Sequence, residues 1–440
     1  MNATNHNNQG RVIITSGRSL MALAAAQSLG KQGIEVIGSD CIEPTLLSFS
    51  KYVTKNETYT SFKENEGQFL IDLEAIIHKH RPEDDRPYLL MPIFEDTHII
   101  AHYKEHLPDY IRIATPAAEA MDRVYPKKNL SFTAQKLGVQ IPDTWSVNSR
   151  EDLESLLPKL PFPVLIKPEN ASGGRGIEKI ATKDELLEQY DKNKEKFGPS
   201  QLIQQQVEGK DYCMTTLFQH GKLKASMAYK NLRRFPTSSG SGVVRETVDD
   251  NFFKPVTLEL MEPLHWHGIA QLDFLWDENP DHAPYLIEVN PRFFGGLFQA
   301  MTSGIDYPWL NYLLHTSGEL PEKPQAQLGT KTKVPFAWLL GIIDENMKLS
   351  DRFDLLTKAG KAAFAQIKEK GIQEAFRNFA LEWQKTGKAP DQVPLGKALE
   401  EAQIAQSEVF TSDDPFAGLG FLYALSYLIK YKKLPPEMDF

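Results

Sequence analysis

Residues 268–296 have the sequence GIAQLDFLWDENPDHAPYLIEVNPRFFGG, and this stretch decides how the region around it folds. Apolar residues dominate 271–276 and 285–289, and many of them are β-branched or aromatic. Such composition favours buried strands, and the Asp, Asn and Pro residues between the two runs favour a turn-rich connection. The stretch therefore predicts two β-strands that belong to a sheet core.

Polar side chains interrupt these two apolar strands. Asp273, Glu288 and Asn290 offer hard oxygen ligands, and an acid in a buried run is costly unless it is paired or binds a cation. Two acids and an amide on adjacent strands suit Mg²⁺, which shares its coordination with water and substrate phosphates. Arg292 adds a bidentate donor for phosphate or carboxylate. The alternative is a hairpin whose polar residues are only surface or capping groups.

The composition excludes several classes of protein. A length of 440 residues indicates two to four domains, and a formal net charge of -9 argues against a nucleic-acid binder. Only Cys41 and Cys213 are present, so we expect no disulfide or cysteine metal site, and a cytoplasmic location. Residues 1–10 lack the apolar core of a signal peptide and are expected to be a disordered lead-in. The apolar run 416–429 is too short for a membrane span and predicts a packed helix, with an interfacial membrane helix as the alternative.

The N-terminal part begins with a β-α-β pattern. Residues 11–16 predict a strand, 20–29 a helix of small residues and 34–40 a second strand, which together indicate a parallel sheet. Residues 88–93 predict a further buried strand. The first turn lacks the GxGxxG pattern of dinucleotide folds, so a nicotinamide site is disfavoured.

The middle of the chain alternates strands and helices, and the region after residue 321 favours helices. The predicted helices are 127–137, 184–196, 358–370, 373–386 and 416–430, and the predicted strands are 164–167, 177–180, 201–207 and 222–229.

Residues 164–177, VLIKPENASGGRGI, combine a strand, a lysine and a glycine-rich loop. Lys167 ends the apolar strand, where a buried ammonium group needs an anion. Backbone N–H groups of the loop 172–176 are open to phosphate, and Arg175 adds a positive charge. The GxxxxGK[ST] pattern of the P-loop is absent. The alternative is a glycine-rich hairpin turn with a purely structural role.

Residues 202–212, LIQQQVEGKDY, predict a strand that leads into a Glu-Gly turn. Backbone groups of such a turn can pair with an adenine edge, and Asp211 can bind ribose hydroxyls. The alternative is a plain strand–turn–strand.

In this order, these segments resemble the ATP-grasp superfamily over residues 113–317, most of all its carboxylate–amine ligases and its carbamoyl-phosphate-synthase-like group. Residues 11–109 resemble the pre-ATP-grasp domain of that superfamily. The resemblance implies a mixed α/β and α+β fold. The expected divisions are a lead-in at 1–10, a parallel-sheet pre-ATP-grasp domain at 11–112, a two-lobed ATP-grasp domain at 113–320 and a mostly helical region at 321–440. Within the ATP-grasp domain, we expect a nucleotide lobe at about 130–207 and a metal and substrate lobe at about 208–320.

The resemblance also implies roles for individual residues. The expected ATP-binding residues are Lys127 (with Lys128 as second choice), Lys167, the phosphate lid Ser172, Gly173, Gly174, Arg175 and Gly176, the adenine hinge Gln204, Gln205 and Val207, and the ribose-binding Asp211. The expected metal ligands are Asp273, Glu288 and Asn290, and the expected catalytic residues are Arg292 and Lys167. Many relatives carry Glu where this chain has Gln204, which puts that side-chain contact in doubt.

The implied activity is an ATP-dependent ligation with Mg²⁺ or Mn²⁺ as cofactor. A small carboxylic acid, an amino acid being one candidate, would be activated as an acyl phosphate and coupled to an amine, giving an amide, ADP and phosphate. The expected partners are the acid and the amine, with a homodimer left open. Two alternatives remain: an enzyme that releases a phosphorylated product, and a nucleotide-binding regulatory module without turnover.

A basic cluster is the candidate for substrate recognition. Lys230, Arg233, Arg234 and Arg245 lie close in sequence, and arginine suits a carboxylate, so Arg233 or Arg245 is expected to contact the acid. The alternative for both arginines is solvation at the surface. The glycine-rich loop and residues 236–243 are the candidate lids.

Overall fold

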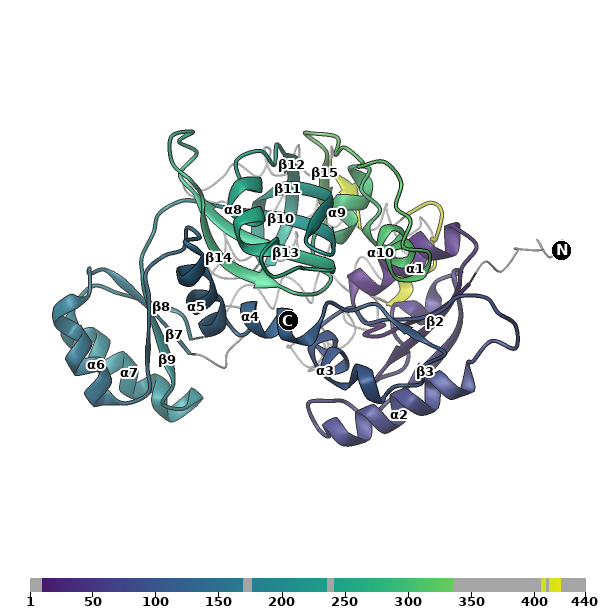
Figure 1. Cartoon of the computed structure of the whole chain (residues 1–440), viewed down its shortest axis with the longest axis horizontal. Helices are drawn as coiled ribbons and strands as arrows, with labels where there is room; N and C mark the ends of the chain where they lie inside the picture. Colours follow the sequence, from purple (N-terminus) through teal and green to yellow (C-terminus); the bar gives the residue numbers. More distant parts are fainter. Residues whose placement is uncertain (1–9, 169–175, 236–240, 335–404, 409–410, 421–440) are drawn as a thin grey trace, which may run out of the picture.

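A computed structural model of the chain describes residues 10–168, 176–235, 241–334, 405–408 and 411–420. Three sheets lie along the long axis of the molecule, with the seven-stranded sheet between a five-stranded and a four-stranded one (Figure 1). Within the described ranges, no helix combines the length and the apolar character that a membrane crossing requires. Both cysteines are free, as expected.

The N-terminal domain is the parallel sheet that the β-α-β pattern predicts. Its strand order is β3-β2-β1-β4-β5, and every neighbouring pair is parallel. Helix α1 starts after Ser19, whose side chain accepts a hydrogen bond from the backbone N–H of Ala22. The elements are β1 (Arg11–Ile14), α1 (Leu20–Lys31), β2 (Glu35–Asp40), η1 (Leu47–Phe49), β3 (Val53–Thr58), α2 (Glu66–Lys79), β4 (Tyr88–Met91), α3 (Asp96–Tyr103), η2 (Lys104–His106) and β5 (Arg112–Ile113).

Two helices lead from this domain into a small antiparallel lobe. Helix α5 ends at Gly138, whose φ of 73° is the left-handed conformation that glycine adopts without strain. The lobe has the strand order β6-β9-β7-β8 with all pairs antiparallel. The elements are α4 (Ala118–Val124), α5 (Lys127–Leu137), β6 (Thr144–Val147), α6 (Arg150–Leu156), η3 (Leu157–Lys159), β7 (Val164–Pro168), β8 (Glu178–Ile180), α7 (Lys183–Phe197) and β9 (Gln201–Gln205).

The seven-stranded sheet has the order β14-β13-β10-β11-β12-β15-β16. Its strands β13 and β14 are the two strands predicted from residues 268–296, and they pair antiparallel. The elements are β10 (Lys210–Gln219), β11 (Lys222–Phe235), β12 (Ser241–Val248), α8 (Lys254–Met261), β13 (Gly268–Trp276), β14 (Tyr285–Asn290), α9 (Leu297–Thr302), α10 (Tyr307–Thr316), β15 (Lys331–Lys333) and β16 (Gln406–Ser407).

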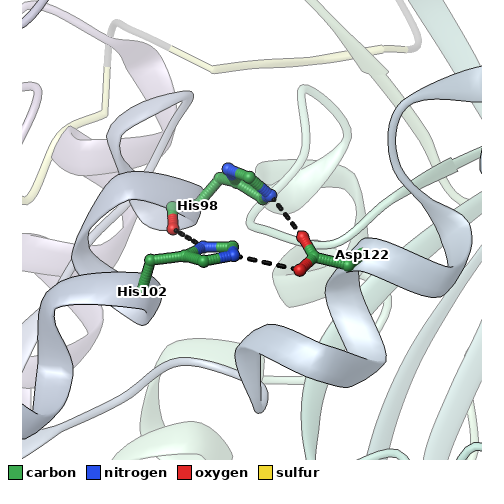
Figure 2. A group of neighbouring side chains, drawn as sticks. All are labelled: His98, His102 and Asp122. Atoms are coloured by element: carbon green, nitrogen blue, oxygen red, sulfur yellow. Dashed lines mark hydrogen bonds and ion pairs between the residues drawn. The ribbon is translucent and has the colours of Figure 1, made fainter.

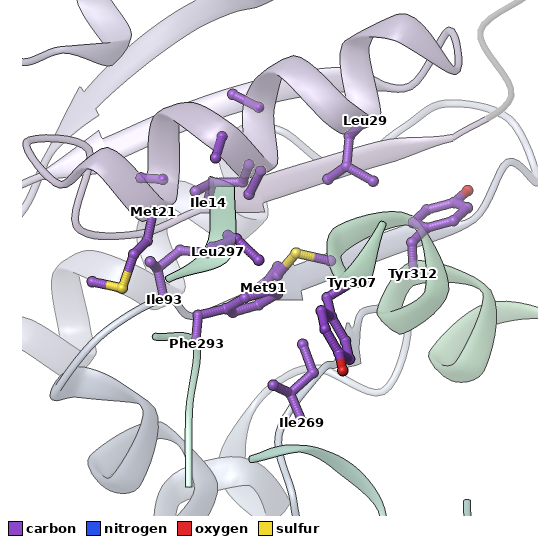
Figure 3. Packing of buried hydrophobic residues seen from close by; sticks show 14 of the residues in the cluster. Ile14, Met21, Leu29, Met91, Ile93, Ile269, Phe293, Leu297, Tyr307 and Tyr312 are labelled. Atoms are coloured by element: carbon purple, nitrogen blue, oxygen red, sulfur yellow. The ribbon is translucent and has the colours of Figure 1, made fainter. Parts of the chain in front are cut away.

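One hydrophobic core joins the N-terminal domain to the seven-stranded sheet. Met91 and Leu29 of that domain lie in the same cluster as Ile269, Leu297 and Tyr307 (Figure 3). A second cluster packs α4, α5 and α8 against the same sheet. The small lobe has its own core, formed by residues between Val147 and Ile203. Helix α5 therefore shares its core with the large sheet, although the expected nucleotide lobe included it from residue 130.

The described part of the C-terminal region contains strands that its helical pattern did not predict. Strand β15 pairs with β12, and β16 pairs parallel with β15, so both extend the large sheet beyond residue 320. The predicted helices 358–370 and 373–386, and most of the predicted helix 416–430, lie outside the described residues.

Candidate nucleotide and metal site

A pocket of about 310 Å³ lies between the small lobe and the seven-stranded sheet. Its lining comes from α5, β7, β9 and β14 together with the segment before β6. The lining residues are Lys127, Leu130, Ser131, Ile141, Lys167, Leu202, Gln204, Leu286 and Ile287. Apolar walls with a few polar groups suit a base and its attached phosphates.

Both lysines that the sequence singled out for the nucleotide line this pocket. Lys127 lies in the first turn of α5, and its Nζ is 3.4 Å from Oε1 of Glu288. Lys167 donates a hydrogen bond to Oε1 of Gln204, whose Nε2 donates to Oγ1 of Thr144 at 2.9 Å. Burial and the nearby Lys127 lower the pKa of Lys167 to about 8, while Glu288 acts in the opposite direction. An anion between the two lysines would relieve this repulsion. Lys128 is not among the lining residues.

The three expected metal ligands meet on neighbouring strands. Asp273 lies directly opposite Glu288, and Gln271 lies opposite Asn290. Asp273 accepts hydrogen bonds from Gln271 Nε2 and from Asn290 Nδ2, the latter at 3.2 Å. Burial and the adjacent Glu288 raise the pKa of Asp273. The amide nitrogen of Asn290 is thus used by Asp273, which leaves its oxygen as the ligand atom.

The chemistry of this donor set fits a divalent cation. Asp273 and Glu288 are two carboxylates side by side, and the repulsion between their charges falls when a cation lies between them. Carboxylate and amide oxygens are the ligands that Mg²⁺ prefers. Asp273, Glu288 and Asn290 would hold the ion.

Arg292 follows this set directly. Its guanidinium lies over the ring of Phe94, 4.4 Å from the centroid, and its Nη1 donates to the backbone oxygen of Phe293 at 3.0 Å. Burial lowers its pKa, and the nearby carboxylates of Glu288 and Glu95 oppose that change. Phe94 and Glu95 follow β4 of the N-terminal domain, so this domain contributes to the surroundings of Arg292.

Asp211, the expected ribose-binding residue, is paired within the protein. It accepts a hydrogen bond from Asn231 Nδ2 at 2.7 Å and forms an ion pair with Arg234. Arg234 also lies in the field of Asp273, so Asp211 and Asp273 both act on the same guanidinium. A nucleotide hydroxyl at Asp211 would therefore share this carboxylate with Asn231 and Arg234.

The sheet register gathers a wider polar surface than the sequence indicated. Directly opposite residues share a face, and one such row contains Tyr229, Cys213, Asp273 and Glu288. The hydroxyl of Tyr229 donates a hydrogen bond to Oε1 of Gln271 at 3.1 Å. Because Nε2 of Gln271 donates to Asp273, the Gln271 amide connects Tyr229 to Asp273. Their positions on long strands carry no recognisable motif, and only the pairing of the strands identifies them.

Several other expected nucleotide residues are not among the residues that line the pocket, or lie outside the described part. Gln205 is tied to Asp143, since its backbone N–H donates to Asp143 O at 2.8 Å and its Oε1 accepts from Asp143 N at 3.3 Å. Val207 lies in the connection between β9 and β10. Gly176 has a φ of 72°, and a Cβ there would lie 2.7 Å from Pro168. Four lid residues, Ser172, Gly173, Gly174 and Arg175, and the lid segment 236–240 are outside the described residues.

The two expected substrate arginines are buried, and neither is a solvated surface residue. Arg245 is 3% exposed and forms an ion pair with Glu408, which is 4% exposed. Among the described residues, Nε of Arg245 has no hydrogen-bond partner. Arg233 is 7% exposed and lies at an irregularity in the pairing of β11 with β12. Glu408 is 163 residues from Arg245 in sequence, so no local pattern predicts this pair.

Comparison with known proteins agrees with this geometry. Residues 127–296 match the family model of the ATP-grasp domain. The C-terminal section of the carbamoyl phosphate synthase large chain from Methanopyrus kandleri is 24% identical over 192 residues, which are 41% of this chain. The match spans about a third (35%) of that relative's own length.

Two solved structures share the fold. Biotin carboxylase from Campylobacter jejuni in complex with β,γ-ATP has a TM-score of 0.59 at 18% identity, covering 73% of this chain and 74% of the other. L-amino acid ligase from Bacillus licheniformis has a TM-score of 0.52 at 16% identity, covering 72% of this chain and 75% of the other. The matched segment 127–296 runs from Lys127 at the start of α5 through the strands β13 and β14. Residues 127–296 therefore form an ATP-grasp domain.

Proposed function

We propose that the chain is an ATP- and Mg²⁺-dependent ligase that couples a small carboxylic acid to an amine and releases ADP and phosphate. The observation that carries this proposal is the pocket lined by both Lys127 and Lys167, with Glu288 paired to Lys127. Asp273 lies opposite Glu288, and Arg292 lies in the field of the Glu288 carboxylate. Cations for phosphate, acids for a metal ion and an arginine for developing charge are the parts that phosphoryl transfer needs.

In the first step, a carboxylate oxygen of the acid attacks the γ-phosphorus of ATP. The new O–P bond forms as the bond to the β,γ-bridging oxygen breaks, giving an acyl phosphate and ADP. Lys127 and Lys167 hold the phosphate oxygens, and Arg292 stabilises the charge on the transferred group. A divalent ion held by Asp273, Glu288 and Asn290 would neutralise further phosphate charge.

In the second step, the amine nitrogen attacks the carbonyl carbon of the acyl phosphate. The C–N bond forms, the C–O bond to phosphate breaks, and the nitrogen loses a proton. The intermediate hydrolyses readily, so water must be excluded between the steps. Arg245 is our candidate for holding the acid, because its guanidinium is buried, its Nη2 lies about 3.5 Å from a Cβ built at Gly295, and its Nε is unpaired among the described residues.

A panel of acids, with and without amines, tests this proposal through ADP release. With an acid labelled with ¹⁸O in its carboxylate, the released phosphate should carry one ¹⁸O, and the amide should appear in the mass spectrum. The variant Lys127→Ala should lose turnover, whereas Lys136→Ala, which removes an exposed charge from the same helix, should keep it. Nucleotide binding without turnover under every condition would refute the ligase and favour a regulatory module.

A second candidate has support from the curated relative, which is a carbamoyl phosphate synthase chain. In that case ADP release would need no organic acid, and the product would retain the phosphate. Bicarbonate-dependent ADP release with a phosphorylated product in the phosphorus NMR spectrum would replace the ligation proposal.

A further inference from the structure

A second group of ligand-type side chains lies outside the nucleotide site, where α3 meets α4. His98 and His102 are four residues apart on α3, and Asp122 lies on α4 (Figure 2). Nε2 of each histidine is 3.0 Å from a different oxygen of the Asp122 carboxylate. Ligand atoms of all three side chains lie within 4.8 Å of one another. Two imidazoles from one helix therefore converge on one acid of the next.

The hydrogen bonding of His102 makes this cluster unusual. Its Nδ1 is 2.9 Å from the backbone oxygen of His98, so Nδ1 carries the proton and donates it. In a neutral ring, Nε2 then carries a lone pair and no proton. This lone pair points at Oδ2 of Asp122, which is also an acceptor. Two acceptors at 3.0 Å repel each other unless a positive charge lies between them. A proton or a metal ion can supply that charge, and a metal ion would also bind Nε2 of His98, which can otherwise donate to Oδ1 of Asp122 as a neutral ring.

We propose that His98, His102 and Asp122 bind one divalent transition-metal ion of the Zn²⁺ class. Two imidazole nitrogens and one carboxylate oxygen are donors that Zn²⁺ accepts at about 2.0–2.2 Å, with water completing a tetrahedron. The backbone oxygen that holds Nδ1 of His102 is the kind of second ligand shell that orients a metal-binding histidine. Mg²⁺ prefers oxygen ligands and is disfavoured here.

The surroundings show what such an ion would connect. Helix α3 belongs to the N-terminal domain, and α4 leads directly into α5, which begins with the pocket residue Lys127. The backbone oxygen of Asp122 also accepts a hydrogen bond from Nδ2 of Asn129 on α5, at 2.8 Å. The ion would therefore tie the N-terminal domain to the helix that forms one wall of the nucleotide pocket. The site is separate from Asp273 and its partners and does not depend on the proposed ligation.

The spacing of the two histidines has a further chemical consequence. His98-x-x-x-His102 has the spacing of a helical zinc-binding pair, but the residue after His98 is Ile99, which cannot act as a general base. The side chains of His98, His102 and Asp122 are 32%, 43% and 47% exposed, so the ion would be reachable from solvent. A structural or regulatory ion that exchanges with the medium fits these features.

Zinc titration of the full chain, after chelator treatment and in excess Mg²⁺, tests the proposal. The wild type should bind one Zn²⁺ per chain, and His102→Ala and His98→Ala should each weaken that binding by at least about 100-fold. The matched control is His282→Ala, because His282 pairs with Asp277 at 2.6 Å without a third ligand among the described residues. Asp273→Asn serves as a control for binding at the nucleotide site. Both controls should bind zinc as the wild type does.

X-ray absorption at the zinc edge makes the test independent of whether the variants fold. The wild-type spectrum should show two imidazole ligands among four nitrogen or oxygen neighbours. Any of three results would overturn the proposal. The first is no zinc bound at about 100 μM, a concentration far above the dissociation constants of protein zinc sites. The others are a spectrum without imidazole ligands, and zinc binding that is lost in Asp273→Asn but retained in the histidine variants.

Discussion

The ionisation of Lys167 predicts how nucleotide binding depends on pH. Burial and the charge of Lys127 lower the pKa of Lys167 to about 8, and only its protonated form attracts phosphate. Binding of a nucleotide favours the charged form and raises that pKa, so affinity is nearly full at pH 7 and falls as the pH rises through about 8. The fraction of protonated Lys167 drops from about nine-tenths at pH 7 to about one-tenth at pH 9. The dissociation constant of ADP should therefore rise about tenfold over this interval.

Titration calorimetry of ADP in two buffers with different ionisation enthalpies measures the linked proton. We expect uptake of about 0.9 proton per ADP at pH 9 and about 0.1 at pH 7. Lys167→Arg keeps its charge throughout this range, so it should bind with little pH dependence and provides the correction for other groups. Lys127→Met removes the repelling neighbour and should move the fall in affinity to higher pH.

The outcome that contradicts this reasoning is specific. If the wild type and Lys167→Arg show the same pH dependence between pH 7 and 9.5, Lys167 does not titrate in this range or does not contact the nucleotide. If the affinity of Lys127→Met falls at a lower pH than that of the wild type, Lys127 raises the pKa of Lys167 instead of lowering it.

Three further predictions concern the site and its supports. Glu288→Gln should reduce turnover at least about 100-fold in steady-state kinetics. Without metal, this variant lacks the repulsion between Glu288 and Asp273, so its urea midpoint should equal or exceed that of the wild type. Glu408→Ala leaves Arg245 buried without its partner and should lower the free energy of unfolding in urea by about 3–5 kcal/mol. A decrease below about 1 kcal/mol would mean that the ion pair is exposed to solvent. Leu297→Ala should cost about 2–5 kcal/mol and loosen the N-terminal domain and the large sheet together in hydrogen exchange. Protection lost from only one of them would contradict a shared core.

Local sequence patterns predicted the parts of the fold whose causes are local. Helix α5 has the predicted bounds because Gly138 supplies the left-handed residue that ends it. The strands β13 and β14 were predictable because long runs of β-branched and aromatic residues favour strands. Lys167 was recognisable because it is a single charge at the end of an apolar strand, next to glycines.

Long-range pairing decides the features that the sequence did not reveal. The pairing of β13 with β14 shifts between Asp273 and Phe274, and this irregularity fixes which residue of β14 lies opposite Asp273. The ion pair of Asp211 with Arg234 and the pairing of β15 with β12 also depend on contacts between distant segments. Neither hydrophobic periodicity nor a short motif contains this information.

The division of the cores explains why the pocket lies where it does. The N-terminal domain and the large sheet share one core, so their relative position is fixed by packing that costs several kcal/mol to disrupt. The small lobe has a separate core, and its Lys167 and Gln204 line the same pocket as Lys127 of the other body, which pairs with Glu288. A ligand with negative charge in the pocket would add attraction between these two bodies, since both sides carry a lysine. Such an attraction would draw the small lobe toward the large sheet, whereas Asp273, Glu288 and Asn290 lie on strands of the sheet that shares its core with the N-terminal domain.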